Sequence, residues 1–252
     1  MVNVQGSAPD LVGLELTAGC ATLWAPAHPS NYWPASRRPY RGVQRRQLGI
    51  CFHTPEEDAD DVEVTPDWFQ DERADASTGY YADSDGDIYQ MVRDRDFPWA
   101  QGVRPAQRVS ASFPPWYDSA RHRSFNSCML SIEIEGRAAT IEDSLVIGGA
   151  QWHSLVRWSG FVAHKYGIPV DRDHFVAHSE LATFKSDPGA GFPWYYFMEW
   201  VGEEVDRLER RASGADLGGV AVMRDLVSDL AQRVESLEKM HGLHAHAAKE
   251  GS

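Results

Sequence analysis

Two short apolar runs that each end in histidine most constrain the fold of this chain. The first run, QLGICFH, covers residues 47–53, and the second, DHFVAH, covers residues 173–178. Short, nearly continuous apolar runs are typical of strands that are buried on both faces of a sheet. We therefore expect two buried strands whose carboxyl ends present His53 and His178.

Two further segments have the pattern of strands. Residues 79–92, GYYADSDGDIYQMV, hold two β-prone runs around Ser-Asp-Gly, which predicts a hairpin. Residues 127–136, SCMLSIEIEG, alternate between apolar and polar side chains, which predicts a strand with Glu133 and Glu135 on the same face.

Helical spacing separates these strands. Apolar residues between Gln151 and Tyr166 recur at helical intervals, and Gly167 is placed to end the helix. A charged helix is also expected after an aromatic cluster at 192–197, ending at Arg211. Strands that alternate with helices predict an α/β fold, with a mixed central β-sheet flanked by helices.

The composition divides the chain into four parts. Residues 1–46 are rich in Pro, Gly and Ala and are expected to form an N-terminal arm, with one strand near Cys20 to Trp24. Residues 47–211 form the expected catalytic domain. The segment ASGADLGG at 212–219 has the composition of a linker, and residues 220–252 follow it as a helix and tail.

The C-terminal helix carries a heptad pattern. Val occupies one apolar position and Met or Leu the other, in Val220, Met223, Val227, Leu230, Val234 and Leu237. Val at a with Leu at d favours parallel two-stranded coiled coils. We expect a homo-oligomer, with a dimer favoured, through residues 220–244; a helix docked on the parent domain is the alternative.

Charge and cysteine usage narrow the classes of partner. The net charge of −13 argues against nucleic acid or an anionic membrane, because both attract basic surfaces. An acidic run at 56–75 contrasts with an arginine-rich run at 34–46, and we expect the acidic run to be a solvated loop or helix face. Three widely spaced cysteines imply no disulfide framework, and Cys51 and Cys128 have the setting of buried residues.

The sequence also bears on where the protein is made. It has no charged segment followed by an apolar one at the N-terminus, and no apolar stretch of 18 residues. We expect a soluble protein that is made in the cytoplasm without a signal peptide and does not insert into a membrane.

Residues 178–189, HSELATFKSDPG, place a histidine, a lysine and an aspartate close to a turn. A catalytic zinc uses three protein ligands and keeps one position open for water. His53, His178 and Asp187 could supply such a set, with His174 as the alternative second histidine. A solvated loop with capping residues is the competing interpretation of this segment.

Five segments together resemble the type 2 N-acetylmuramoyl-L-alanine amidases, a family that includes phage endolysins, recycling amidases and peptidoglycan recognition proteins. The similarity spans roughly residues 47–200, in order and at suitable spacing. The segments are GICFHT at 49–54, STGYYADSDGDIYQMV at 77–92, PWAQG at 98–102, LSIEIEG at 130–136 and HSELATFKSDPG at 178–189.

The resemblance implies a role for each candidate residue. His53, His178 and Asp187 would bind zinc, which lowers the pKa of water to near ~7. Glu133 stands where the family has its catalytic glutamate and could accept a proton and return it to the leaving amine. Lys185 matches the family's lysine and would stabilise negative charge on the attacked carbonyl.

The chain departs from the family pattern at two places. The family often has histidine where Gly79 stands, and Trp-His-Ala-Gly where residues 99–102 are Trp-Ala-Gln-Gly. Neither place holds a metal ligand, so the departures put substrate contacts in doubt rather than activity.

We therefore expect a zinc amidase that cleaves the bond between N-acetylmuramic acid and L-alanine in peptidoglycan. A non-catalytic peptidoglycan-binding module is the alternative, and the complete set of candidate residues favours catalysis. The expected setting is a phage endolysin that reaches the cell wall through a holin-type membrane lesion. A cytoplasmic recycling amidase acting on soluble muropeptides is the second possibility.

Overall fold

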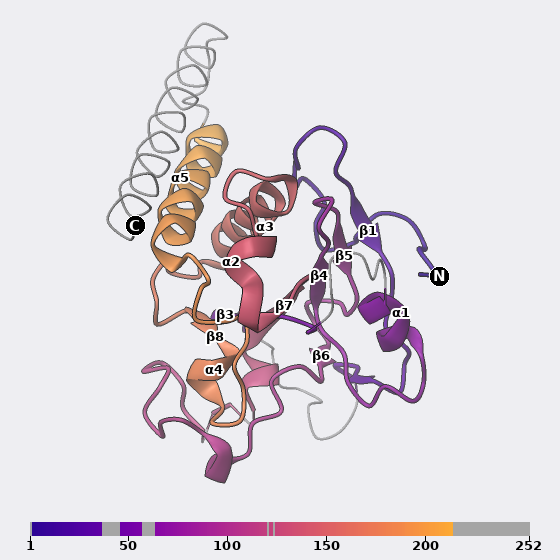
Figure 1. The fold of residues 1–252 in the computed structure, drawn as a ribbon, viewed down its shortest axis with the longest axis vertical. Helices are drawn as coiled ribbons and strands as arrows, with labels where there is room; N and C mark the ends of the chain where they lie inside the picture. The colour runs from indigo at the N-terminus through magenta and orange to yellow at the C-terminus, as the bar shows by residue number, and fades with distance from the viewer. Residues whose placement is uncertain (1, 37–45, 57–63, 120, 123, 214–252) are drawn as a thin grey trace, which may run out of the picture. The chain divides into compact units, whose positions relative to one another are not determined.

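The computed structural model describes residues 2–36, 46–56, 64–119, 121–122 and 124–213 (Figure 1). The chain forms two compact units, Met1–Val205 and Asp206–Ser252. Of the second unit, the described residues are the C-terminal part of one helix. The predicted linker, apart from Ala212 and Ser213, and the predicted heptad helix lie outside the described residues, as do most of the arginine-rich run and part of the acidic run.

A six-stranded sheet forms the centre of the first unit, with strand order β1-β5-β4-β7-β3-β8. Its strands are β1 (Thr22–Trp24), β3 (Gly49–His53), β4 (Tyr80–Ala82), β5 (Ile88–Gln90), β7 (Met129–Ile134) and β8 (Phe175–Ala177). Only the β4–β5 hairpin pairs antiparallel within this sheet, and every other pair is parallel. The predicted mixed sheet is confirmed, and so is the hairpin around Ser-Asp-Gly.

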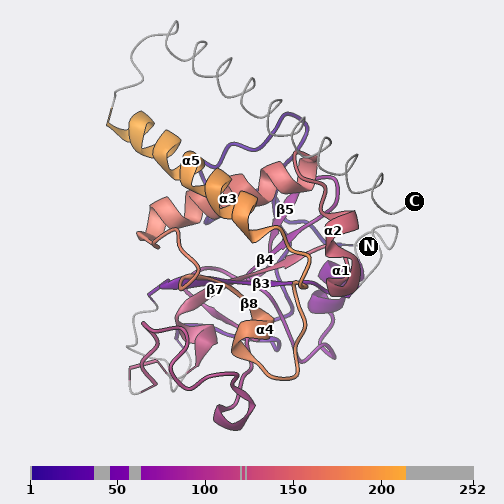
Figure 2. The same cartoon turned by 60° about the vertical axis from the view of Figure 1, so that its left-hand side comes forward.

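Two long helices cover one face of the sheet. They are α3 (Ala150–Tyr166) and α5 (Trp194–Ala212), and Figure 2 shows α3 and the start of α5 on the side of the sheet opposite α4 (His178–Leu181). α3 ends where the sequence predicts, because Gly167 adopts a left-handed conformation with φ 65°.

The alternation of side chains along β3 determines which face of the sheet holds the predicted metal ligand. Ile50 and Phe52 lie in the main core with Trp152 and Phe197 from α3 and α5. Cys51 points to the other face, where it packs in a smaller core with Val176. Since successive strand residues alternate between faces, His53 lies on the face of Cys51, away from the two long helices.

The remaining elements of the fold are short, and no pattern in the sequence predicts them. They are a second sheet of β2 (Tyr32–Trp33) and β6 (Phe97–Pro98), helices α1 (Val64–Gln70) and α2 (Ile141–Ser144), and 3-10 turns η1 (Pro105–Gln107), η2 (Phe125–Ser127) and η3 (Ala138–Thr140). In the described part of the chain, no helix has the length and apolar character needed to cross a membrane.

The N-terminal arm is bound to the domain by strand pairing and by partly buried and exposed hydrogen bonds. β1 adds to the edge of the sheet by parallel pairing with β5. Asp10 Oδ2 accepts hydrogen bonds from Gln90 Nε2 at 2.6 Å and from the Asp94 amide at 3.0 Å. Lys165 Nζ donates to the Asp10 carbonyl at 2.6 Å. The arm is therefore an integral layer of the fold, as its predicted strand suggested.

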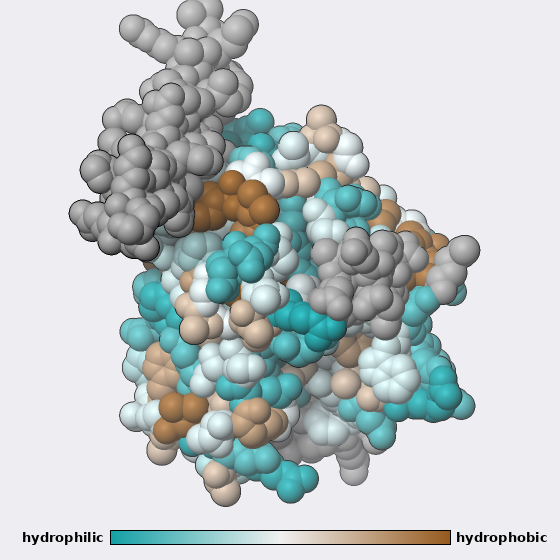
Figure 3. All heavy atoms as spheres, in the orientation of Figure 1, coloured by the Kyte–Doolittle hydropathy of each residue, from teal (hydrophilic) through white to brown (hydrophobic). Residues whose placement is uncertain are grey.

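The face of the molecule drawn in Figure 3 is mostly hydrophilic where it is coloured, with apolar residues in small separate groups. All three cysteines are free, and Cys51 and Cys128 are buried as the sequence predicts. Most apolar side chains lie in the cores around the sheet, and the polar side chains of His53 and Glu133 come from paired positions near the carboxyl ends of β3 and β7.

Candidate metal centre

The ends of two neighbouring strands bring the predicted histidines together. β3 and β8 are parallel partners, so their carboxyl ends lie at the same edge of the sheet. His53 is the last residue of β3, and His178 follows directly after β8. His178 is the first residue of α4 rather than part of the strand, so its side chain leaves from a strand-to-helix turn.

Asp187 reaches the histidines from the loop that follows α4. The Ser179 amide donates a hydrogen bond to the Asp187 carbonyl at 3.0 Å, which folds the loop back onto the helix. Gly189 has φ 108°, and a Cβ atom there would lie 2.1 Å from the Ala138 carbonyl oxygen. The glycine that closes the motif is therefore required by close packing against the segment after β7.

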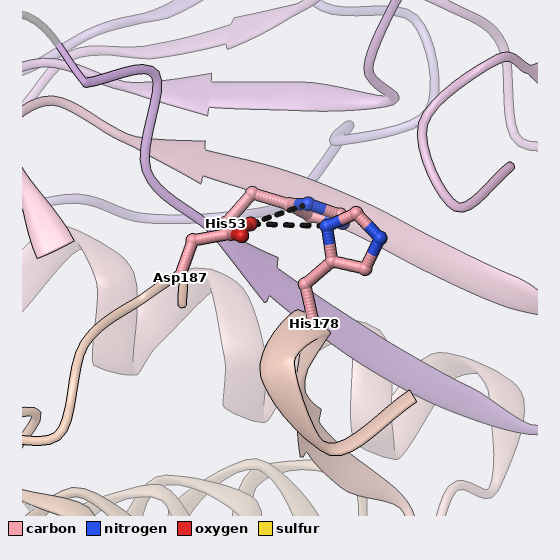
Figure 4. A group of neighbouring side chains, drawn as sticks. All are labelled: His53, His178 and Asp187. Carbon is pink, nitrogen blue, oxygen red and sulfur yellow. Dashed lines mark hydrogen bonds and ion pairs between the residues drawn. The ribbon is translucent and has the colours of Figure 1, made fainter. Parts of the chain in front are cut away.

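The three predicted ligands converge on one point (Figure 4). Asp187 Oδ2 lies 3.1 Å from His53 Nδ1 and 3.1 Å from His178 Nδ1. The ligand atoms of the three residues all lie within 4.8 Å of one another, and all three residues are buried. The two imidazole rings meet edge to face, with their centroids 4.4 Å apart.

Burial and mutual charge set the protonation of this group. Burial, and after it the neighbouring His178, lowers the pKa of His53 to about 4, despite the opposing effect of Asp187. Burial acts to raise the pKa of Asp187, but hydrogen bonds from His178 and His53 outweigh it and hold that pKa well below its usual range. At neutral pH the site therefore contains a carboxylate beside a neutral His53, and neutral imidazole is the form that ligates metals.

The donor set fits a zinc ion. Two imidazole nitrogens and one carboxylate oxygen are common zinc ligands, and three protein ligands leave a fourth position open for catalysis. The Nε2 atoms of His53 and His178 are buried and have no hydrogen-bond partner among the residues that the structure describes. Both rings therefore make their hydrogen bonds through Nδ1, on the side where a cation would lie.

Both predicted catalytic residues lie beside the three ligands. Glu133 is paired with His53 in the β3–β7 register, so the two side chains share a face of the sheet. Lys185 is exposed in the loop between His178 and Asp187, and its positive charge helps to lower the pKa of His53. The ligand cluster therefore has a carboxyl group on the adjacent strand and an ammonium group in the adjoining loop.

The alternative ligand His174 lies outside this group. Its Nδ1 is 2.6 Å from Asp171 Oδ1, and its ring stacks on Trp116 with a centroid distance of 5.9 Å. His153 and His164 lie on α3, as the sequence predicts. The geometry thus supports His178 over His174 as the second ligand.

The two departures from the family pattern occupy packed positions. Gly79 donates its amide to Ser131 Oγ at 2.8 Å, and a Cβ atom there would lie 3.1 Å from the Ser131 carbonyl oxygen. Gln101 is fully buried and donates to the Leu130 carbonyl at 3.3 Å. In this chain the two positions therefore support the strand under the site.

One carboxylate beside the site gives no signal in the sequence. Glu56 Oε1 accepts a hydrogen bond from Thr54 Oγ1 at 2.7 Å and from the Ala138 amide at 3.1 Å. It joins the segment after β3 to the segment after β7. Glu56 stands at the start of an acidic run, and the sequence alone does not distinguish it from the other acids of that run.

A family model described as N-acetylmuramoyl-L-alanine amidase matches residues 42–190. Among solved structures, AmpD is 18% identical, with a TM-score of 0.51, and the match covers 73% of this chain and 95% of AmpD. The similarity to AmpD shows a shared fold. No curated protein matches this chain.

Two further solved structures have lower scores. AmiD from E. coli, in complex with anhydro-N-acetylmuramic acid-L-Ala-D-gamma-Glu-L-Lys, is 21% identical, with a TM-score of 0.45, and the match covers 65% of this chain and 61% of AmiD. The endolysin of a Thermus scotoductus bacteriophage is 19% identical, with a TM-score of 0.44, and the match covers 64% of this chain and 91% of the endolysin.

Proposed function

Since this chain belongs to the N-acetylmuramoyl-L-alanine amidase family and is an enzyme of that class, we propose that it works as a zinc hydrolase on peptidoglycan. The bond cleaved is the amide between the lactyl group of N-acetylmuramic acid and L-alanine. His53, His178 and Asp187 are the metal ligands in this proposal. The observation that carries it is the convergence of their ligand atoms within 4.8 Å in a buried site.

The residues around the ligands have complementary tasks. A bound zinc ion supplies a Lewis acid that makes water nucleophilic near neutral pH. Glu133 accepts the proton that water gives up and returns it to the nitrogen of L-alanine as the amide bond breaks. Lys185 places its ammonium group beside the carbonyl oxygen, where negative charge develops as the carbon becomes tetrahedral.

The presence of these two residues supports catalysis over binding alone. A module that only binds peptidoglycan needs neither a proton acceptor nor a cation beside the attacked carbonyl. Glu133 is on the strand next to His53, and Lys185 is in the loop that leads to Asp187. Glu133 is thus held on the strand that pairs with that of His53, and Lys185 lies in the same loop as Asp187.

Metal analysis combined with product identification tests the proposal. We expect one zinc ion per chain, and peptides with a new N-terminal L-alanine after incubation with purified peptidoglycan. His178→Ala is expected to lose both the metal and the activity. His174→Ala is the matched control, because this histidine binds Asp171 instead, and it should keep both. Full activity after exhaustive chelation would contradict the metal mechanism, and release of other fragments would contradict the bond assignment.

We further propose that the substrate is the intact cell wall, as expected of a phage endolysin. The support is the heptad pattern at 220–237, because a dimer would raise the effective concentration of the enzyme at a polymeric substrate. Activity on intact sacculi should exceed activity on soluble muropeptides, and the reverse result would favour a recycling amidase. Sedimentation should give a dimer for the full chain and a monomer for a chain ending at Arg211.

A further inference from the structure

Trp194 lies beyond the part of the chain that matches the family, yet it contacts residues in or next to both strands that lead to the metal-binding histidines. It is the first residue of α5, and the family match ends at residue 190. Its ring meets the ring of Phe52 edge to face, with the centroids 5.4 Å apart. Phe52 directly precedes His53 on β3, so Trp194 packs behind one of the two histidines.

A second contact of Trp194 is with a guanidinium group. The Arg172 guanidinium carbon lies 3.5 Å from the centre of the Trp194 ring, which is a close cation–π arrangement. Arg172 Nη1 also donates to the carbonyl of Phe175, the first residue of β8. The arginine is therefore held between the indole and the strand that leads to His178.

Arg172 in turn holds the carboxylate that shapes the turn at His178. Arg172 Nη2 donates to Glu180 Oε2 at 2.6 Å. The same oxygen accepts a hydrogen bond from the Ala177 amide at 2.7 Å. Ala177 ends β8 and His178 begins α4, so Glu180 bonds the backbone at the point where the chain changes from strand to helix. A carboxylate in the first turn also suits the positive end of the helix.

We infer that Trp194, Arg172 and Glu180 form a positioning bracket that sets the orientation of the metal-binding histidines, so that α5 contributes to metal affinity. The inference rests on the proposed zinc function. None of the three residues belongs to the ligand set. They act through Phe52 on the strand that carries His53, and through Ala177 on the turn that carries His178.

The chemistry of arginine makes the bracket testable by conservative change. A planar guanidinium can stack flat on an indole while it donates in its own plane to two acceptors, and a lysine ammonium cannot stack in this way. Arg172→Lys therefore keeps the charge and removes the stacking. Glu180→Gln keeps an oxygen that can accept from the Ala177 amide and removes the ion pair. Each variant isolates one contact of the bracket.

The experiment measures zinc affinity on the full-length protein, by competition with a chromophoric chelator, at a temperature where the metal-free form is folded. Removing a group that orients a metal ligand typically weakens metal binding by 10–100-fold, and an indirect contact should lie at the low end. We expect about ten-fold weaker binding for Arg172→Met, and smaller losses for Arg172→Lys and Glu180→Gln. Arg157→Met is the matched control, since Arg157 lies on α3 and donates to the Glu15 carbonyl. It should bind zinc as the wild type does.

A second readout separates positioning from simple stabilisation. The absorption bands of the cobalt-substituted protein report the geometry of the ligands, and they should shift in Arg172→Met and in Trp194→Leu but not in Arg157→Met. If Trp194→Leu fails to fold, Arg172→Lys carries the same test. Unchanged zinc affinity and an unchanged cobalt spectrum in the Arg172 and Glu180 variants would overturn the bracket. A wild-type protein that binds no zinc would instead overturn the proposed function, and the bracket with it.

Discussion

His53 and Glu133 occupy directly paired positions on the parallel strands β3 and β7. Neighbouring strands lie about 4.8 Å apart, and paired residues project from the same face of a sheet. Glu133 therefore lies next to a predicted metal ligand, and β7 does not have to move to bring its side chain there. This pairing gives a separate test of catalysis and of metal binding.

Replacement of Glu133 should strongly reduce catalysis and leave metal binding unchanged. Glu133→Ala removes the proton acceptor and none of the three ligands. We expect zinc content equal to that of the wild type and a loss of turnover of about 10²–10⁴-fold, the usual contribution of a general base. Zinc content and kcat, measured on the same preparation, check this. Full lytic activity in the variant would reject Glu133 as the proton carrier.

Lys185 should affect kcat more than substrate binding. Its ammonium is proposed to stabilise charge that develops only during the reaction, so Lys185→Met should lower kcat by about 10²–10³-fold. Lys185→Arg should restore part of that loss, because the charge is kept. Ser186→Ala, at the exposed neighbouring position, is the control. A change confined to KM would show that the lysine only binds substrate.

Asp83 should make the protein less stable as the pH rises. Burial, followed by the charges of Asp87, Glu135 and Asp85, raises the pKa of Asp83 to about 7. The folded state therefore prefers the protonated acid, and stability falls between about pH 4 and pH 7. Asp83→Asn keeps an acceptor for the Asp87 amide and should gain about 1–2 kcal/mol at pH 7, after a discount for partial exposure, and almost nothing at pH 4. Urea unfolding at the two values of pH checks this, and an equal difference at both would contradict it.

The metal-free site should titrate in the opposite direction. The pKa of His53 is about 4 in the folded protein and 6.5 for the free side chain, so protonation favours the unfolded state. In chelated Asp83→Asn protein, stability should be full above about pH 6.5 and fall by up to about 3 kcal/mol as the pH drops to about 4. Asp187, whose pKa is lowered, should extend the loss below that range. Stability that rises on acidification through this interval would show that His53 is charged in the folded state.

Asp10 should be a stabilising contact of the N-terminal arm. Its carboxylate accepts hydrogen bonds from Gln90 Nε2 and from the Asp94 amide. Asp10→Ala leaves partly buried donors without this acceptor, which typically costs about 1–3 kcal/mol. Val12→Ala is the control on the same arm, because that side chain is 81% exposed. Equal denaturation midpoints for the two variants would show that the arm is held by β1 alone.

The longer elements of the fold follow from local patterns. β7 and α3 are predicted from the period of their apolar residues, β3 from a continuous apolar run, and the β4–β5 hairpin from two β-prone runs around a turn. β2, β6 and α2 span two to four residues, too few to establish a period. They form because the surrounding chain is already packed, and a local sequence pattern does not reveal such packing.

The site was predictable to the extent that its residues lie at the ends of such elements. His53 and His178 end or follow buried strands, and Asp187 stands before a Pro-Gly turn, so their types and positions point to a metal. Arg172, Glu180 and Trp194 resemble surface or core residues in the sequence. Their connection depends on a turn and a helix meeting in space, and it becomes visible only in the folded chain.

The arm also determines how the domain can be shortened. β1 covers the side of β5 that β4 leaves open, and β1 is only three residues long. A chain that began at residue 42, where the family match starts, would leave the backbone amides and carbonyls of β5 exposed along one margin of the sheet. Exposed margins of this kind recruit strands from other molecules. Residues 2–36 thus keep β5 from pairing with strands of other molecules, and the smallest well-behaved form of the enzyme includes them.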